Sequence, residues 1–263
     1  MKTIAFLTEK GGSGKTTQSY NFAEYLAHTG NSVLLIDIDQ QESLSSELYG
    51  IQTTDGTSVN FFRNVPIQTH KINDRLDFIP SSLAIDLVET ELMPKDLRAL
   101  TLTFWFEDHG QELMKYDYII FDCHPDFKTV NQNVAAFCDV IVSPLEPSQF
   151  GIAAKQKIET RFRWLQEQIV NPATRETLIN TKLVFINNLV DIRNTDSKML
   201  VEKSENDGDI VATLPKKQLF AQSIRQNYPV VKMYEDKNLR NTHEKFFKKF
   251  FNAYEALKKS IDD

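Results

Sequence analysis

Residues 9–17 read EKGGSGKTT, and this stretch decides the fold of the 263-residue chain. It follows a short apolar run at residues 3–8 and precedes a helical pattern at residues 15–28. A glycine-rich loop between a strand and a helix is the arrangement that binds phosphate groups. The alternative is an ordinary turn of small residues, and the position, the flanking elements and the Gly-Lys-Thr-Thr ending all argue against it.

Each residue type in this loop has a physical role in holding phosphate. The glycines let successive backbone N–H groups point inward with no Cβ in the way. The helix N-terminus adds partial positive charge, Lys15 reaches the outer phosphates, and the hydroxyl of Thr16 is a ligand for a bridging Mg²⁺. We therefore predict a nucleotide site formed by Gly11, Gly12, Ser13, Gly14, Lys15, Thr16 and Thr17.

A second lysine, Lys10, stands in front of the glycines. The run KGGSGKTT at residues 10–17 resembles the deviant phosphate loop, K-G-G-x-G-K-[ST]-[ST], of the ParA/MinD ATPases. In that family two subunits enclose two ATP molecules, and the early lysine reaches the phosphates bound by the partner. The resemblance implies ATP and Mg²⁺ as cofactors, an ATP-dependent homodimer, and catalytic roles for Lys10 and Lys15.

The second expected strand ends in two carboxylates. Residues 35–41, LIDIDQQ, resemble the family segment L-I-D-x-D-P-Q. The resemblance implies that Asp39 helps to position the attacking water and that Asp37 supports the magnesium ion. Gln40 stands where the family has proline, which predicts a less rigid turn. The alternative is a pair of aspartates that cap the next helix.

A third strand is expected to end at Asp122. Residues 116–123, YDYIIFDC, resemble the family segment Y-D-x-I-I-I-D-C, which implies that Asp122 holds a magnesium-bound water. The family continues with P-P-S, whereas this chain has HPD at residues 124–126, in the segment expected to respond to the γ-phosphate. We interpret His124 as a loop histidine rather than a catalytic base, because phosphoryl transfer depends on positioning and charge.

Near the C-terminal end, residues 212–217 read ATLPKK and occupy the place of the family's I-P-R-N turn beside the adenine. The resemblance implies adenine contacts for Pro215 and Lys217, although Lys217 replaces asparagine. Asn187 and Asn188, which follow a predicted strand, are further candidates for adenine neighbours.

Apolar runs alternate with helical patterns along the whole chain. Strands are expected at residues 3–8, 33–36, 76–79, 118–121, 140–142, 183–186 and 210–212, with Pro80 and Pro144 closing two of them. Helices are expected at residues 15–28, 97–115, 127–137, 150–170, 196–204, 217–227 and 239–260. This order predicts a single α/β domain over residues 1–263, with a mostly parallel, twisted sheet covered by helices on both faces. Residues 52–75 are irregular and are expected to be a loop-rich decoration.

The composition sets limits on function. With 41% hydrophobic and 25% charged residues, the chain has the make-up of a globular protein. Its two cysteines, Cys123 and Cys138, form neither a disulfide framework nor a C-x-x-C pair, which favours a reduced, cytoplasmic setting. They also argue against a redox protein like the nitrogenase iron protein, whose cluster needs suitably placed cysteines. No signal sequence and no membrane-spanning run are expected.

Charge is unevenly distributed along the chain. Residues 214–263 hold eleven basic and six acidic residues, a local net charge of +5 in a chain whose total is −6. Such an asymmetry favours a polyanion-facing end. The basic residues expected to meet DNA phosphates are Lys232, Lys237, Arg240, Lys245, Lys248 and Lys249.

Two functions remain for an ATPase of this kind. The first is a ParA-type partition ATPase: its ATP dimer binds DNA without sequence preference on the nucleoid, and a ParB-like partner stimulates slow hydrolysis to move plasmid or other DNA cargo. The second is a MinD-like ATPase that binds a membrane through residues 246–251, FFKKFF. We favour the first, because Phe247, Phe250, Phe251, Tyr254 and Leu257 recur at the spacing of a helix that packs against a core.

Overall fold

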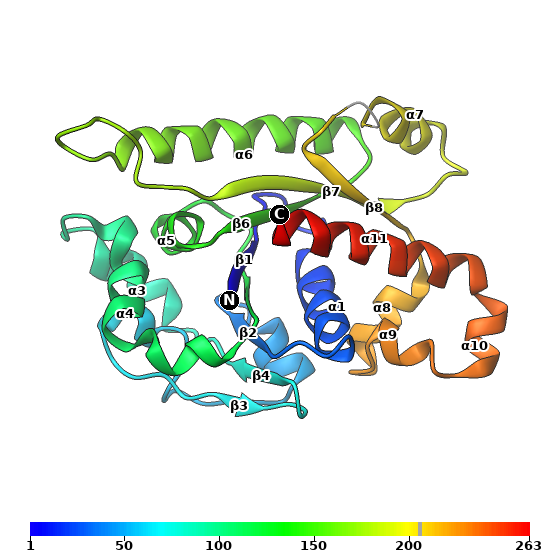
Figure 1. The fold of residues 1–263 in the computed structure, drawn as a ribbon, viewed down its shortest axis with the longest axis horizontal. Coiled ribbons are helices and arrows are strands. Elements are labelled where there is room, and N and C mark those ends of the chain that lie inside the picture. Colours follow the sequence, from blue (N-terminus) through cyan, green and yellow to red (C-terminus); the bar gives the residue numbers. More distant parts are fainter. Residues whose placement is uncertain (205–206) are drawn as a thin grey trace.

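The computed structural model describes residues 1–204 and 207–263. The described residues form an eight-stranded sheet in the order β3-β4-β2-β5-β1-β6-β7-β8, covered by helices on both faces (Figure 1). The strands are β1 (Lys2–Phe6), β2 (Val33–Asp37), β3 (His70–Lys71), β4 (Leu76–Ile79), β5 (Tyr118–Asp122), β6 (Val140–Leu145), β7 (Lys182–Val190) and β8 (Ile210–Pro215). The pair β3–β4 is antiparallel and the remaining pairs of named strands are parallel. The predicted fold class is confirmed.

The helices alternate with these strands. They are α1 (Lys15–His28), α2 (Asn60–Arg63), α3 (Ile85–Leu92), α4 (Thr101–His109), α5 (Thr129–Phe137), α6 (Gln149–Gln168), α7 (Thr195–Ser204), α8 (Gln218–Arg225), α9 (Val230–Met233), α10 (Lys237–Thr242) and α11 (Glu244–Asp262). A π-helical turn, η1 (Ser43–Leu48), follows β2, and two 3₁₀ turns, η2 (Arg98–Leu100) and η3 (Gly110–Lys115), flank α4.

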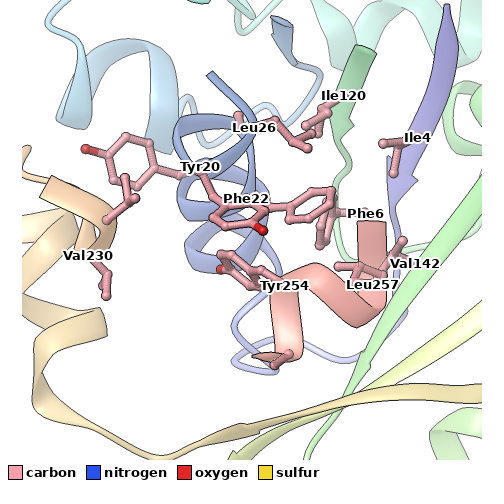
Figure 2. Close-up of a cluster of buried hydrophobic side chains, with 14 of the residues drawn as sticks. Ile4, Phe6, Tyr20, Phe22, Leu26, Ile120, Val142, Val230, Tyr254 and Leu257 are labelled. Atoms are coloured by element: carbon pink, nitrogen blue, oxygen red, sulfur yellow. The ribbon is translucent and has the colours of Figure 1, made fainter. Parts of the chain in front are cut away.

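The sheet separates two hydrophobic clusters, because side chains alternate between its faces along each strand. On β1, Ile4 and Phe6 enter one cluster and Ala5 enters the other. Figure 2 shows the first cluster, in which α1 and α11 cover the sheet. There the ring of Phe22 meets the ring of Tyr254 edge to face, with centroids 5.2 Å apart. Helices α3 to α6 cover the second cluster.

The aromatic stripe of α11 lies in this core. Phe247, Phe250, Tyr254 and Leu257 are each at most 1% exposed, whereas Phe251, at the edge of the stripe, is only partly buried. The stripe therefore packs on the sheet, as its spacing predicts, and it fixes which side of α11 faces outward. No described helix is long and apolar enough to cross a membrane.

Four predicted strand ends are wrong. The strand expected at residues 3–8 ends at Phe6. Pro144 does not close its strand, because β6 runs on to Leu145. Pairing with β1 stops at Val142, so the missing N–H of Pro144 costs no bond on that side. Strand β7 runs to Val190 and β8 to Pro215, as the two strands pair with each other beyond the apolar runs that suggested their ends.

The C-terminal region also differs from the single helix expected at residues 239–260. Asp236 accepts hydrogen bonds from the N–H groups of Asn238 and Leu239, and this cap starts α10 at Lys237. The helix then breaks at His243, and α11 continues to Asp262. Upstream, the expected loop at residues 52–75 contains the short helix α2 and the edge strand β3.

Candidate functional site

The glycine-rich loop lies at the carboxyl end of β1, which is an interior strand between β5 and β6. Helix α1 begins at Lys15, directly after Gly14. Gly14 has φ +86°, and a Cβ there would lie 2.4 Å from Nδ2 of Asn188. Both the backbone angle and this close approach require glycine, so the loop passes tightly over Asn188 on its way into the helix.

A pocket of about 260 Å³ opens above this loop. Its walls are Lys10, Gly11, Gly12, Ser13, Gly14, Lys15, Thr16, Thr17, Asp39 and Pro125. The fold therefore brings the predicted phosphate loop and Asp39 to one cavity. The first turn of α1 carries no acidic side chain, so its N–H groups and partial positive charge are available to an anion in this pocket.

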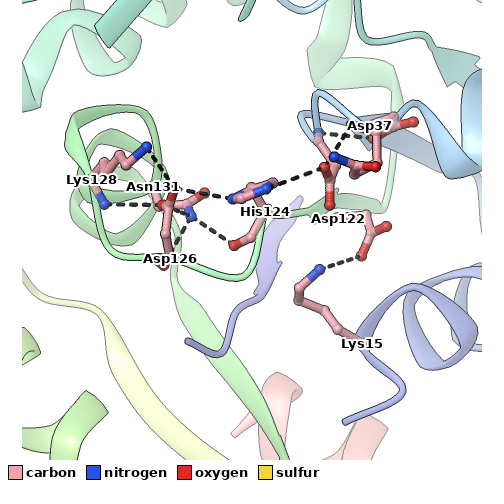
Figure 3. Close-up of polar contacts among 9 residues, drawn as sticks. Lys15, Asp37, Asp122, His124, Asp126, Lys128 and Asn131 are labelled. Carbon is pink, nitrogen blue, oxygen red and sulfur yellow. Dashed lines mark hydrogen bonds and ion pairs between the residues drawn. The ribbon is translucent and has the colours of Figure 1, made fainter. Parts of the chain in front are cut away.

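Lys15, which lines the pocket, lies beside a buried group of opposite charge, Asp122. Nζ of Lys15 lies 3.8 Å from Oδ1 of Asp122, and the two side chains are 7% and 1% exposed (Figure 3). The hydroxyls of Thr16 and Ser19 also act on the Asp122 carboxylate, whereas the hydroxyl of Ser13 has no hydrogen-bond partner among the described residues. Burial raises the pKa of Asp122, and Lys15 opposes that shift. Buried polar atoms of this kind are satisfied when a ligand or hydrated cation binds.

Asp37 lies beside Asp122, because the two residues pair in register at the ends of the neighbouring strands β2 and β5. Asp37 is fully buried and accepts hydrogen bonds from the N–H of Asp39 at 3.0 Å and from the hydroxyl of Ser45 at 2.7 Å. Burial, followed by repulsion from Asp122, raises the pKa of Asp37 to about 7. Ser45, in the π-helical turn, was not identified from the sequence.

The raised pKa of Asp37 predicts how the ligand-free protein responds to pH. Between its ordinary value of 3.8 and about 7, the folded state binds more protons than the unfolded state. The contribution of Asp37 to the free energy of unfolding is therefore fully present below about pH 4 and is lost as pH rises through about 7. The total loss is up to roughly 4 kcal/mol. Asp37→Asn should flatten this fall. Urea unfolding at about pH 5 and about pH 8, without nucleotide or Mg²⁺, measures it.

Asp108→Asn, on the exposed surface of α4, is the control and should leave the wild-type pH profile unchanged. Parallel profiles for wild type and Asp37→Asn would contradict the prediction.

Lys10 lies at the rim of the pocket, with 32% of its side chain exposed, and forms an ion pair with Glu146 at the end of β6. The preceding residue, Glu9, pairs with Lys157 at 2.6 Å and with Arg161 at 2.9 Å, both on α6. The start of the loop is therefore bound to α6, which lies on the opposite face of the sheet from α1. The motif carries no signal for these contacts, because the partners lie far away in sequence.

The proposed adenine neighbours do not share one location. Nδ2 of Asn188 donates to the carbonyl oxygen of Ser13 at 2.7 Å, so this side chain holds the phosphate loop. Asn187 donates to Ser204 at 2.7 Å and lines a separate pocket of about 140 Å³. Both asparagines lie within β7 rather than after it, and neighbouring strand residues point to opposite faces.

The other two predicted adenine contacts lie further along the chain. Pro215 ends β8, and Lys217 directly precedes α8. Neither is among the described residues that line the pocket above the phosphate loop. Their role beside a base stays a prediction.

The segment after β5 approaches Asp39. His124 bonds through Nδ1 to Asp126 at 3.0 Å, and its Nε2 lies 3.9 Å from Oδ1 of Asp39 (Figure 3). The side-chain amide of Asn131 donates to the carbonyl oxygen of His124 at 2.8 Å and to the Asp126 carboxylate at 2.7 Å. The histidine that departs from the family pattern is therefore held next to the carboxylate expected to position water, which the sequence alone did not indicate.

The predicted DNA-contacting residues lie in two settings. Exposed side chains belong to Lys237 on α10 and to Lys245, Lys248 and Lys249 on α11. The other two have partners within the protein. Arg240 lies over the ring of Tyr234, 5.3 Å from its centroid, and Nζ of Lys232 lies 3.7 Å from the buried carboxylate of Glu24. The lysines of α11 are thus the better placed for an external polyanion.

A parallel sheet with a glycine-rich loop on an interior strand, a helix directly after it, and carboxylates on the next strand ends defines a P-loop nucleotide-binding protein. A family model described as an AAA domain matches residues 1–175. The chain belongs to this family, and its named relatives place it among the ParA/MinD ATPases, as the sequence predicted.

Two relatives illustrate the match. The sporulation initiation inhibitor protein Soj of Bacillus subtilis is 29% identical over 199 residues, which cover 72% of this chain and 75% of Soj. An uncharacterized protein of Methanocaldococcus jannaschii is 33% identical over 182 residues, covering 65% of this chain and 69% of that protein.

Two solved structures share the fold. Apo McdA from Cyanothece superimposes with a TM-score of 0.79 at 19% identity, over 98% of this chain and 99% of McdA. A plasmid partition protein of Borrelia burgdorferi bound to AMPPNP gives a TM-score of 0.72 at 21% identity, over 95% and 98% of the two chains.

Proposed function

We propose that this protein is a ParA-type ATPase that dimerises on ATP, binds DNA without sequence preference, and leaves DNA when a partner stimulates hydrolysis. The observation that carries the proposal is the pocket itself, which joins Lys10, the glycine-rich loop, Lys15 and Asp39 around one cavity. Those are the groups needed to hold a triphosphate, to reach a second subunit, and to direct a water molecule.

The residues present fit ATP with Mg²⁺. Backbone N–H groups of the loop and the ammonium of Lys15 would hold the phosphates, while Thr16, Asp37 and Asp122 would hold the hydrated ion. The buried carboxylate of Asp122 beside the hydroxyl of Thr16, and the unpartnered hydroxyl of Ser13, support this assignment. Bound Mg²⁺ would neutralise charge that develops on the phosphate oxygens. Asp39 would orient water toward the terminal phosphorus, and the bond from that phosphorus to the bridging oxygen would break.

Dimer formation would engage Lys10. Its ion pair with Glu146 keeps it at the rim, within reach of a second copy facing the pocket. Sedimentation with a non-cleavable ATP analogue and Mg²⁺ tests this step. The wild type should become dimeric, and Lys10→Ala should remain monomeric while still binding nucleotide. A wild type that stays monomeric when saturated with the analogue would overturn the proposal.

The exposed lysines of α11 support DNA as the surface to which the dimer binds. Replacing Lys245, Lys248 and Lys249 with glutamine should weaken ATP-dependent binding to non-specific DNA and flatten its dependence on salt. For every DNA phosphate that the variant no longer neutralises, the slope of log K against log salt should fall by about 0.9. Titration of a fluorescent duplex at several salt concentrations measures both quantities.

A matched control removes equal charge from another part of the chain. Lys71, Lys95 and Lys115 are exposed and lie outside α10 and α11. Their triple glutamine variant should keep the wild-type salt slope. An unchanged slope in the α11 variant would exclude this helix as the DNA face.

The proposed cargo is plasmid or other DNA, with the ATP-loaded dimer on the nucleoid and a ParB-like protein as the stimulating partner. Support comes from the relatives, which include a virulence plasmid ParA family protein of Chlamydia psittaci that is 33% identical over 165 residues. Retention on non-specific DNA with ATP, lost when ATP is replaced by ADP, is the expected behaviour.

The membrane-bound alternative has no support from α11. Of the four phenylalanines in residues 246–251, Phe246, Phe247 and Phe250 are at most 6% exposed, and Phe251 is partly buried against the same core. Co-sedimentation with plasmid DNA or with anionic liposomes, each with ATP, separates the two functions. Binding to liposomes alone would favour the membrane function.

A further inference from the structure

A chain of buried hydrogen bonds connects helix α11 to the phosphate loop. The hydroxyl of Tyr254 donates to Oε1 of Gln18 at 2.7 Å, and Nε2 of Gln18 donates to Oδ1 of Asn188 at 3.0 Å. Nδ2 of Asn188 then donates to the carbonyl oxygen of Ser13 at 2.7 Å. The four residues are each at most 2% exposed. Helix α11, helix α1 and strand β7 therefore act on one peptide group of the loop.

The donor and acceptor of each of these three hydrogen bonds follow from the bond to the Ser13 carbonyl oxygen. A carbonyl oxygen can only accept, so Asn188 must present its NH₂ group to the loop and its oxygen to Gln18. Gln18 must then present its own oxygen to Tyr254, which has a proton to donate. Burial raises the pKa of Tyr254 well above its ordinary value, so the hydroxyl keeps that proton at neutral pH.

The orientation of the Ser13 carbonyl matters for the pocket. When this oxygen is held against Asn188, it lies away from the space where phosphate oxygens bind, and the N–H groups of the loop are left to face the anion. Asn188 also lies close enough to Gly14 that a Cβ at Gly14 would be 2.4 Å from Nδ2. The amide thus supports the loop at two consecutive residues.

We propose that Tyr254, Gln18 and Asn188 are positioning residues that hold the phosphate loop in its anion-binding conformation. Loss of the Tyr254 hydroxyl leaves Oε1 of Gln18 buried without a donor. The Gln18 amide can then turn to another partner, and Asn188 loses the donor that fixes its oxygen, so its amide is held less firmly against the Ser13 carbonyl. Nucleotide affinity would therefore depend on the position of α11 relative to α1. This inference rests on the proposed nucleotide site.

Tyr254→Phe is the sharpest test, because it removes one oxygen and keeps the ring that packs on Phe22. Equilibrium binding of a fluorescent ATP analogue with Mg²⁺ and without DNA should weaken about tenfold, which corresponds to about 1.4 kcal/mol. The matched control is Tyr118→Phe. The hydroxyl of Tyr118 also bonds to α11, at Asp262 Oδ1 and 2.7 Å, but is not connected to the loop. It should change affinity by less than about twofold.

A double-mutant cycle separates positioning from general destabilisation. If Tyr254 acts through Asn188, Tyr254→Phe combined with Asn188→Ala should bind nucleotide no more weakly than Asn188→Ala alone. Additive losses, or equal affinities for Tyr254→Phe and Tyr118→Phe, would contradict the proposal that Tyr254 acts on the loop through Gln18 and Asn188. Gln18→Met breaks the same chain at its centre and replaces Tyr254→Phe if that variant does not fold. A wild type that binds no nucleotide would instead contradict the proposed function, and with it the positioning role of these three residues.

Discussion

Lys15→Ala is expected to reduce ATP affinity and turnover by about 10²–10³-fold, the cost of removing one preorganised electrostatic donor from a phosphoryl-transfer site. Lys15 is 6% exposed and lines the pocket, and its ammonium is the cation paired with the buried Asp122. Without it, the triphosphate would lose its main side-chain cation, and the remaining carboxylates of the site would repel the anion.

The measurement combines nucleotide binding by calorimetry with phosphate release. Lys115→Ala, which removes an exposed lysine outside the pocket, is the control and should match wild type. Circular dichroism checks that the variant folds, which we expect because burial favours the protonated form of Asp122 once its cation is gone. Wild-type turnover in Lys15→Ala would show that hydrolysis occurs elsewhere.

Asp39→Ala has the second-largest expected effect and a different signature. Asp39 lines the pocket and accepts a hydrogen bond from the N–H of Gln41 at 2.9 Å, which fixes its carboxylate after β2. Loss of the group that orients water should lower turnover by about 10²-fold or more. ATP affinity should change little, because Asp39 is not among the groups assigned to the phosphates.

The variant should therefore accumulate as an ATP-loaded dimer with prolonged retention on DNA. Single-turnover hydrolysis, together with dissociation from immobilised DNA after ATP is removed, measures both properties. Asp108→Ala on the surface of α4 is the control and should behave as wild type. If Asp39→Ala hydrolyses ATP at the wild-type rate, the role assigned to Asp39 is wrong, and the neighbouring His124 becomes the next residue to test.

Local sequence patterns were sufficient for the order of elements. Short apolar runs with a proline, glycine or aspartate after them marked most strands, and the helical spacing of Phe247, Phe250, Tyr254 and Leu257 identified the buried side of α11. Helix α3 shows the same helical spacing in its buried residues Ile85, Val88 and Leu92, but the sequence analysis did not predict this helix, which lies between irregular segments. Such patterns work because burial repeats with the period of the element itself.

Element ends depended on contacts that the local pattern does not contain. Pro144 continues β6 because its neighbour β1 has already ended pairing. Strand β7 extends through Asn187 and Asn188, where polar residues suggested a loop, because β8 pairs alongside it. Strand pairing overrides local polarity when a neighbouring strand supplies the hydrogen bonds.

The sequence by itself determined the phosphate loop, the carboxylates at the strand ends and the family, because each is a short run whose spacing reflects its chemistry. Only the tertiary structure decided what holds that loop in place. Glu146, Asn188 and Tyr254 reach it from strands and helices far along the chain. Side chains meet at a site because of how elements pack, and packing brings together residues whose distance in sequence carries no signal.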